Sequence, residues 1–319
     1  MNKFLNPTFN FFTSGKLNRL SVKRLNNEWI HNKIKDETSK FIVLSNLKIL
    51  VHEEPVLHAV FFSIKNLPEE LTEGEKVIFL GEASGVNYFC LDVTGFPDAN
   101  YFLGFGVFKE LRSVAHFLDR EVGAVLAYAR AIINWHNNHQ YCGVCGGPTF
   151  VAEAGHKRVC SNSECATEHF PRTDPAVIML VEKNDNCLLA RQAKWPQGQY
   201  STIAGFVEPG ESLEQAVQRE VLEETGVYVE QIKYHSSQPW PFPAAIMLGF
   251  RATAVTENIK LGDHELEDAN WFSRQDIVEQ VKKGTLRFPP PISISFRLIQ
   301  DWFDEDSPVG LEELIRFSK

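Results

Sequence analysis

The chain has 319 residues, which is long for a single hydrophobic core and suits two domains that each bury an apolar centre. Its composition, 44% hydrophobic and 23% charged, is that of an ordinary globular protein and excludes collagen, coiled coil and wholesale disorder. The net charge of −9, from 32 basic and 41 acidic residues, argues against a protein that wraps duplex nucleic acid by bulk electrostatics. No apolar run approaches the roughly 18 residues of a membrane helix, so we expect no membrane span and no membrane partner.

Residues 1–138 are predicted to form a β-rich domain that ends in a helix. Short apolar runs separated by turn residues predict strands at 41–44, 59–62, 77–80 and 88–91. Apolar residues at helical spacing between Asp119 and Asn137 predict the closing helix.

The start of this domain is basic, because residues 1–50 carry nine Lys/Arg against three Asp/Glu. Such a surplus fits a transit peptide, a weak polyanion handle or, as we favour from composition, a solvated domain surface. Core positions in this segment are expected at Phe9, Phe11, Phe12, Leu17 and Leu20.

Residues 139–170 are predicted to form a zinc ribbon. Cys142 and Cys145 are followed, after fourteen residues, by Cys160 and Cys165, and glycines next to the first pair supply tight turns. This is the paired spacing of four thiolates around one tetrahedral zinc ion. A redox-active CxxC is the alternative, but it usually lies in a thioredoxin-like strand–helix context, which is absent from the sequence here. With four protein ligands, the zinc is expected to be structural.

The other two cysteines, Cys90 and Cys187, lie within apolar runs and are expected to be buried free thiols. Free thiols and thiolate ligands indicate a reducing compartment inside the cell. The cytoplasm is the location that we favour, with peroxisomes and mitochondria as alternatives.

Residues 171–319 are predicted to form a second α/β domain, entered through an extended segment from Pro171 to Pro175. Strands are predicted at 176–181, 187–190, 201–207 and within 244–255, and an amphipathic helix at 292–303. Strands and helices mixed in this way indicate a three-layer α/β sandwich.

An acidic segment in this domain, residues 205–227, carries the chemistry. Ser212 can cap a helix that runs to about Thr225, and Gly226 ends it. Its glutamates lie near one another on the helix surface, where they repel and raise one another's pKa unless a cation neutralises them; they are Glu220, Glu223 and Glu224. An acidic helix is a solvated face in most proteins. The flanking glycines and the single Arg219 argue against that interpretation here.

These positions match the pattern Gly-x5-Glu-x7-Arg-Glu-U-x-Glu-Glu-x-Gly-U, with U aliphatic, and the segment resembles the signature of the Nudix hydrolases. That family cleaves a nucleoside diphosphate linked to another moiety. The resemblance implies a Nudix α/β/α sandwich in which Glu220, Glu223 and Glu224 hold two or three Mg²⁺ or Mn²⁺ ions, and in which Arg219 orients the glutamates. Hard carboxylate oxygens are ligands that such hard divalent ions prefer.

A second motif, Ser237-Gln-Pro-Trp-Pro-Phe-Pro-Ala-Ala-Ile-Met247, is a rigid wall of prolines and aromatic rings. It resembles the array of the NADH pyrophosphatase branch, which also carries a four-cysteine ribbon before its catalytic domain. Residues 289–294 and 11–19 also resemble that branch, so the resemblance covers nearly the whole chain.

Further roles follow from this resemblance, position by position. Glu265 matches a glutamate that completes the metal site, with Glu267 as its competitor and a surface acid as the plain alternative. Ala204 matches a position whose backbone carbonyl binds metal. Phe206 matches a ring that stacks on the base, although a core phenylalanine is the alternative. Further substrate contacts are implied at Phe170, where some members have tyrosine, and in the array at Gln238 and Trp240.

The implied activity is hydrolysis of the pyrophosphate of NADH or NAD⁺ to nicotinamide mononucleotide and AMP, with removal of an NAD cap from RNA as a related activity. The alternatives are a broader ADP-ribose or dinucleoside diphosphate hydrolase and a non-catalytic nucleotide sensor. A sensor should have lost metal-binding glutamates, and this chain retains them. The family also implies a homodimer.

Overall fold

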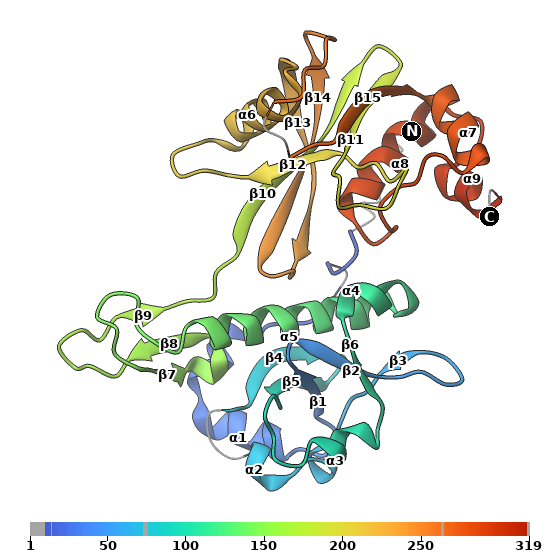
Figure 1. Cartoon of the computed structure of the whole chain (residues 1–319). Helices are drawn as coiled ribbons and strands as arrows, with labels where there is room; N and C mark the ends of the chain where they lie inside the picture. Colours follow the sequence, from blue (N-terminus) through green and yellow to red (C-terminus); the bar gives the residue numbers. More distant parts are fainter. Residues whose placement is uncertain (1–9, 14, 73–75, 263–264, 318–319) are drawn as a thin grey trace. The chain divides into compact units, whose positions relative to one another are not determined.

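The computed structural model describes residues 10–13, 15–72, 76–262 and 265–317 (Figure 1). The chain divides into two compact units. We call residues 12–173 with 240–244 the N-terminal unit, and residues 174–239 with 245–317 and the described residues before 12 the C-terminal unit. The ribbon therefore belongs to the same unit as the domain before it, and the predicted domain limits at 138 and 170 stay predictions.

The C-terminal unit is built on a mixed sheet with the order β13-β14-β10-β11-β15, to which β12 adds by pairing with β10. The central strands β10 and β14 are parallel, with Val177 opposite Leu248. The strands are β10 (Asp174–Lys183), β11 (Asn186–Arg191), β12 (Ile203–Phe206), β13 (Val229–Trp240), β14 (Ala245–Ala254) and β15 (Asp268–Ser273). The predicted strands at 176–181, 187–190, 201–207 and within 244–255 are confirmed, although β10 starts inside the predicted linker.

Helices cover both faces of this sheet, as the alternation of β10 side chains requires. Val177, Met179 and Val181 pack with α6 on one face, whereas Ile178 and Leu180 pack with α7, α8 and α9 on the other. The helices are α6 (Leu213–Thr225), α7 (Arg274–Lys283), α8 (Ile294–Asp306) and α9 (Leu311–Phe317). The expected α/β/α sandwich is thus confirmed, and the predicted helix at 292–303 corresponds to α8.

Four neighbouring strands in the sheet of the N-terminal unit repeat the connectivity of β13-β14-β10-β11, which the sequence does not reveal as a repeat. The order of this sheet is β3-β2-β1-β5-β4, with β6 on β2, and its central strands β1 and β5 are again parallel. The strands are β1 (Lys40–Ser45), β2 (Lys48–His52), β3 (His58–Ala59), β4 (Ile78–Ala83), β5 (Val86–Asp92) and β6 (Val107–Lys109). The short helices are α1 (Asn27–Lys35), α2 (Glu69–Thr72), α3 (Ala99–Leu103) and α4 (Leu111–Val114).

Helix α5 (Arg120–Asn138) lies along this sheet against β1, β2, β4 and β5, and it confirms the predicted closing helix (Figure 1). The side chain of Asp119 caps its first turn by accepting from the backbone N–H groups of Glu121 and Val122. After the helix, the ribbon forms a three-stranded sheet of β7 (Thr149–Ala152), β8 (Lys157–Cys160) and β9 (Glu168–His169).

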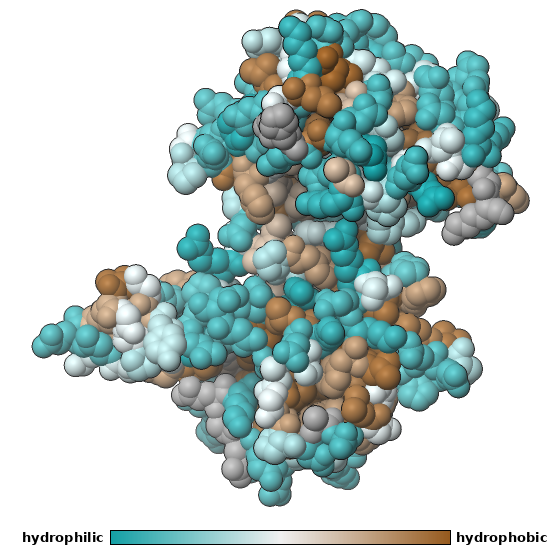
Figure 2. All heavy atoms as spheres, in the orientation of Figure 1, coloured by the Kyte–Doolittle hydropathy of each residue, from teal (hydrophilic) through white to brown (hydrophobic). Residues whose placement is uncertain are grey.

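The expected core positions near the N-terminus are partly confirmed. Phe11 and Phe12 are buried, whereas Leu17 and Leu20 are half-buried. Phe9 lies outside the described residues. Figure 2 shows hydrophilic residues interspersed with hydrophobic ones on the visible face of each unit. Within the described ranges, no helix combines the length and the apolar character that crossing a bilayer requires.

Candidate active site

Helix α6 begins and ends where local sequence signals place its limits. Ser212 accepts from the backbone N–H of Gln215, and the Gln215 side chain accepts from the backbone N–H of Ser212, which forms a capping box. Gly226 follows the helix with φ 69°, a left-handed conformation that favours glycine. The helix therefore presents its acidic last turns at a fixed place beside the sheet.

The three glutamates of α6 differ in exposure. The side chain of Glu220 is 13% exposed and that of Glu223 is 52% exposed, whereas residue Glu224 is only 4% exposed. Burial raises the pKa of Glu220, and the nearby negative charges of Glu223 and Glu265 raise it further, against the opposing effect of Arg219. A carboxyl group in this situation gains from a cation, which would stabilise its charged form.

The carboxyl group of Glu220 packs against the backbone of strand β12. Gly205, opposite Val177 in the sheet, lies directly under the carboxyl group. A Cβ atom at position 205 would stand only 1.9 Å from Cδ of Glu220 and 2.0 Å from its Oε1. The glycine in the motif therefore leaves room for the Glu220 carboxyl group beside the strand backbone, and a larger residue there would displace that carboxyl group.

Arg219 ties the cluster together. Its Nη1 donates to Oε1 of Glu220 at 2.9 Å and to Oε2 of Glu223 at 3.1 Å. Its Nη2 also donates to the backbone oxygen of Phe206 at 2.9 Å. These bonds place Arg219 in contact with two of the glutamates, and its orienting role stays a prediction.

Glu211 completes this network, although no separate role was predicted for this residue from the motif. Nε and Nη2 of Arg219 donate to its two carboxylate oxygens at 2.6 and 2.9 Å, which is a bidentate pair. The hydrogen bonds from Arg219 and from the backbone of Glu208 hold the pKa of Glu211 at about 2. The spacing of eight residues between Glu211 and Arg219 is the signal that could have indicated this pairing.

The residues beside the glutamates face outward. Ala204 is exposed on β12, opposite Ile178. Phe206 is 61% exposed, so the alternative interpretation as a core phenylalanine is wrong. A large ring held in solvent next to a carboxylate cluster is available for stacking on a flat ligand.

The two candidate acids in the loop before β15, Glu265 and Glu267, have different interactions. Glu267 pairs with Arg191, and its backbone N–H donates to the Arg191 oxygen at 2.9 Å. Glu265 instead acts electrostatically on Glu220, whose pKa it raises. This arrangement supports Glu265 and not Glu267 as the distant member of the carboxylate cluster.

The donor set of this cluster is that of a hard divalent cation, since it consists of carboxylate oxygens. In the described part of the chain, the compact group of three or more ligand atoms is formed by cysteines and not by these glutamates. The carboxylates repel one another, and Arg219 draws Glu220 and Glu223 toward its own guanidinium. To bind one cation together, these glutamate side chains would have to rotate away from Arg219.

The array residues have different positions. Gln238 is fully buried in the C-terminal unit, where Nε2 donates to the backbone oxygens of Phe11 and Ile292 and Oε1 accepts from the N–H of Ile294. Both amide protons are thus used within the fold, and this argues against the substrate contact predicted for Gln238.

Trp240 and Phe170 belong to the N-terminal unit. The Trp240 ring packs edge-on against the rings of Phe12 and Phe242, and the guanidinium of Arg112 lies 5.5 Å from its centroid. Phe170 is 56% exposed. Their predicted contacts with substrate stay predictions.

The four cysteines of the ribbon form the second centre. All four Sγ atoms lie within 4.8 Å of one another, with Cys142 to Cys165 at 3.8 Å and Cys145 to Cys160 at 3.3 Å. Zn–S bonds of about 2.3 Å in a tetrahedron place sulfur atoms about 3.8 Å apart, so the site fits one structural zinc ion. The backbone N–H of Val144 also donates to Sγ of Cys142 at 3.4 Å, as expected for a thiolate.

The two other cysteines, Cys90 and Cys187, are fully buried, and burial raises the pKa of both thiols. They are buried free thiols, as predicted.

Comparison with known families gives three consecutive matches. Residues 172–291 match the NUDIX domain, residues 137–170 the NADH pyrophosphatase zinc ribbon domain, and residues 38–135 the NADH pyrophosphatase-like rudimentary NUDIX domain. The last match agrees with the repeated sheet connectivity of the N-terminal unit.

Curated relatives carry related names. The chain is 34% identical to the NAD-capped RNA hydrolase NUDT12 of Macaca fascicularis, with 92% of this chain and 73% of the relative covered. It is 33% identical to the NAD-capped RNA hydrolase of Schizosaccharomyces pombe, with 93% of each chain covered. It is also 38% identical to the mitochondrial NAD(P)H pyrophosphatase NUDT13 of Homo sapiens, over 63% of this chain and 61% of that one.

Three observations point to the same family: the acidic helix packed against Gly205, the four-cysteine centre and these matches. The chain belongs to the Nudix hydrolase family, in the branch that carries the NADH pyrophosphatase zinc ribbon.

Proposed function

We propose that the chain hydrolyses the pyrophosphate of NADH and NAD⁺ to a nicotinamide mononucleotide and AMP, and that it removes the NAD cap from RNA. The observation that carries this proposal is the carboxylate cluster of α6, in which Glu220 packs against Gly205 and accepts a hydrogen bond from Arg219. The names of the relatives, which are NAD-capped RNA hydrolases and an NAD(P)H pyrophosphatase, support the same substrate class.

In this reaction, a water oxygen forms a bond to one phosphorus while the bond from that phosphorus to the bridging oxygen breaks. The bridging oxygen leaves on the other phosphate, and the proton of the water passes to a carboxylate. Mg²⁺ or Mn²⁺, two or three ions per site, would supply charge neutralisation and an acidified water. We propose as their ligands the side chains of Glu220, Glu223, Glu224 and Glu265 and the backbone carbonyl of Ala204.

The residues of the chain then have distinct roles. Glu224, or another glutamate of the cluster, accepts the proton of the attacking water, and burial keeps bulk water away from Glu224. Arg219 and Glu211 hold the other carboxylates in place through their bidentate pair. Phe206 stacks on the nicotinamide or the adenine through its exposed ring.

Removal of an NAD cap is the same bond cleavage, because only the first nucleotide of the RNA has to enter the site. The basic surface near the N-terminus offers contacts to the RNA backbone, for instance through the exposed side chains of Lys23 and Lys40. We further propose that the chain forms a homodimer and that it works in a reducing compartment, with the cytoplasm favoured. The thiolates of the ribbon and the free thiols of Cys90 and Cys187 support such a compartment.

The test is kcat/KM on NADH, NAD⁺, ADP-ribose and NAD-capped RNA in a single buffer that contains Mg²⁺ or Mn²⁺. We expect NADH or NAD⁺ to be preferred over ADP-ribose, and capped RNA to lose nicotinamide mononucleotide. A preference of tenfold or more for ADP-ribose would replace the proposal with a broader hydrolase, and failure to cleave any of the four would contradict catalysis altogether.

A further inference from the structure

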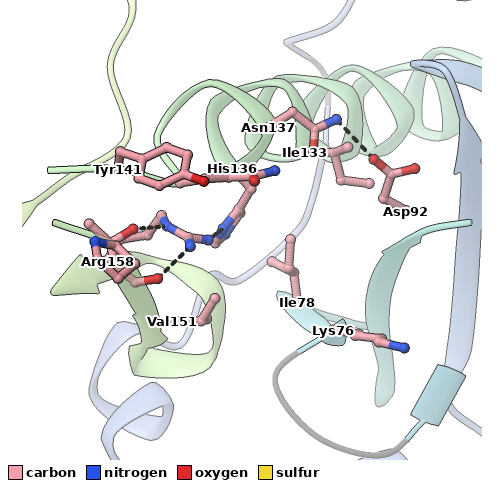
Figure 3. A pocket seen from close by; sticks show the side chains of 12 residues that line it. Lys76, Ile78, Asp92, Ile133, His136, Asn137, Tyr141, Val151 and Arg158 are labelled. Atoms are coloured by element: carbon pink, nitrogen blue, oxygen red, sulfur yellow. Dashed lines mark hydrogen bonds between the residues drawn. The ribbon is translucent and has the colours of Figure 1, made fainter. Parts of the chain in front are cut away.

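A pocket of about 400 Å³ lies in the N-terminal unit, between the end of α5, the ribbon and the strands β4 and β5 (Figure 3). Polar side chains in its lining are bound to groups of the protein itself. Asn137 donates to Oδ2 of Asp92 at 2.9 Å, and Nε of Arg158 donates to Oγ1 of Thr149 at 2.7 Å. Because these bonds join α5 to β5 and β8 to β7, we assign these side chains to the fold and propose no ligand for this pocket.

An ion pair of the C-terminal unit, between Arg191 and Glu267, has a closer relation to the carboxylate cluster. Arg191 is the last residue of β11, and its Nη1 pairs with Oε2 of Glu267. The backbone joins the same two residues, because the N–H of Glu267 donates to the oxygen of Arg191 at 2.9 Å. Nη2 of Arg191 donates to the backbone oxygen of Trp195 at 3.2 Å. The guanidinium is therefore held in place, and it holds Glu267 in turn.

The burial of Arg191 makes this attachment effective. The side chain of Arg191 is only 12% exposed, whereas that of Glu267 is 48% exposed. An ion pair between two exposed side chains adds little to stability, but loss of one partner of a buried charge leaves that charge without compensation. Removal of the Glu267 carboxylate should therefore disturb this end of the segment more than removal of a surface acid would.

The segment between β14 and β15, residues 255–267, is also attached to the end of α6. The backbone N–H of Lys260 donates to the oxygen of Thr225 at 2.8 Å. A Cβ atom at position Gly262 would stand 2.0 Å from the backbone oxygen of Glu223, so the segment lies directly against the last turn of the helix there. One end of the segment is thus fixed to the helix that carries the carboxylate cluster.

Glu265 lies between these two attachments. It comes two residues before Glu267, and Leu266 between them packs against the apolar core that α6 shares with the sheet. Two residues span at most about 7 Å of chain, so the place of Glu267 limits the positions that Glu265 can reach. The electrostatic effect of Glu265 on Glu220 indicates that its carboxylate lies near the cluster.

We propose that Arg191 and Glu267 are positioning residues that hold Glu265 at the carboxylate cluster, so that their ion pair sets the affinity of the site for Mg²⁺ or Mn²⁺. The inference rests on the proposed function for the identity of the metal ligands. It adds two residues that act through Glu265 and not by binding the metal themselves. Groups that hold metal ligands in place typically change metal affinity 10- to 100-fold when they are removed.

A simple effect of charge makes a different prediction for the same two residues. Glu267→Gln removes a negative charge and should weaken the binding of a nearby cation, whereas Arg191→Gln removes a positive charge and should strengthen it. Positioning predicts weaker binding in both variants, because either substitution breaks the pair. The direction of the effect in Arg191→Gln therefore separates the two explanations.

The test is titration of the zinc-loaded full-length chain with Mn²⁺ in the absence of substrate, with free Mn²⁺ measured by electron paramagnetic resonance. The variants are Glu267→Gln, Arg191→Gln and the conservative Arg191→Lys, together with Glu265→Gln alone and combined with each of the first two. Glu257→Gln is the matched control, since Glu257 is an exposed acid of the same segment whose carboxylate lies 3.9 Å from Nζ of Lys183. Tm is measured for every variant.

We expect Glu267→Gln and Arg191→Gln each to weaken Mn²⁺ binding by about tenfold, at the lower end of the range for groups that act through a ligand. Arg191→Lys should lose much less, because it retains the charge that pairs with Glu267, and Glu257→Gln should bind Mn²⁺ as the wild type does. In the Glu265→Gln background, the substitutions at 191 and 267 should have little further effect, because the side chain that they hold is no longer a ligand.

The proposal is overturned if Glu267→Gln binds Mn²⁺ as tightly as Glu257→Gln does, or if Arg191→Gln binds it more tightly than the wild type. It is also overturned if Glu265→Gln leaves Mn²⁺ binding unchanged, or if the substitutions at 191 and 267 keep their full effect in that background. Hydrolysis of NADH by the same preparations is a separate readout. A chain that binds Mn²⁺ as expected but cleaves no NADH would contradict the proposed function and leave the role of the ion pair intact.

Discussion

Gly205→Ala is the substitution that most directly tests how the helix and the strand assemble the carboxylate cluster. The backbone of Gly205 has no positive φ, so alanine fits its conformation and the perturbation is purely steric. The new Cβ would stand 1.9 Å from Cδ of Glu220, and an ordinary contact needs at least 3.4 Å. The carboxyl group must therefore retreat by about 1.5 Å (3.4 minus 1.9), whether the chain turns or α6 shifts.

A displacement of this size has a predictable effect on catalysis. Misplacement of a catalytic group by about 1 Å costs on the order of 10²-fold in rate, which is about 2.7 kcal/mol of barrier. We expect kcat/KM on NADH to fall by about that factor at saturating Mg²⁺, with only a small change in Tm, because the end of a flexible side chain absorbs the contact.

Controls separate this mechanism from general damage. Gly104→Ala changes a glycine whose new Cβ would meet only an ordinary contact at 3.5 Å, and it should leave kcat/KM unchanged. Glu220→Asp shortens the side chain, so adding Gly205→Ala to it should cost much less than Gly205→Ala costs alone. A Gly205→Ala enzyme with kcat/KM within about twofold of wild type would refute the claim that catalysis depends on the position of the Glu220 carboxyl group against Gly205.

Three further outcomes are expected. Cys142→Ser or Cys165→Ser should lower zinc content and Tm, because a broken four-ligand site loses folding free energy; a zinc-free variant with normal Tm would exclude a structural zinc. Phe206→Ala should raise KM for NADH by roughly one to two decades through loss of a stacking contact, and since the ring is 61% exposed Tm should change little; a large drop in Tm with unchanged KM would end the stacking assignment. Burial lowers the pKa of His136 and of His156 to about 4, from an ordinary 6.5. Between pH 6.5 and 4 the unfolded chain therefore binds protons that the folded chain does not. The free energy of unfolding should decrease as the pH falls from 6.5 to 4, and this contribution should be constant above pH 6.5. Thermal melts in which His136→Gln loses none of this acid sensitivity would contradict the assignment to that ring.

The sequence predicts elements whose signals are local. Helix α6 is capped by Ser212 and ended by Gly226, and both act within a few residues of the helix. The zinc ligands could also be predicted, because the two cysteines of each pair are only a few residues apart in the sequence. No strand was predicted at β13 because polar, exposed and half-buried residues, and not an apolar run, make up most of its length.

Features that depend on contacts between distant segments could not be predicted from the sequence. The close contact between Gly205 and the Glu220 carboxyl group arises only when β12 meets α6, and the bidentate pairing of Glu211 with Arg219 arises only when the loop folds back on the helix. The hydrogen bonds of Gln238 with Phe11 and Ile292 join segments more than fifty residues apart along the chain, so its structural role was not visible in the motif. The repeated sheet connectivity of the N-terminal unit is likewise a property of strand order, which sequence patterns do not carry.

Hydrolysis of NADH by Glu224→Gln, measured at saturating Mg²⁺ beside Glu214→Gln, tests the central assignment most directly. The amide keeps the shape of a buried side chain but removes a charge that would bind metal, whereas Glu214 is an exposed acid in the first turn of the same helix. We expect kcat to fall by a factor that corresponds to several kcal/mol of barrier in Glu224→Gln, with Tm and zinc content retained, and no change in Glu214→Gln. A Glu224→Gln enzyme that keeps the kcat of the wild type would contradict the placement of the active site on α6.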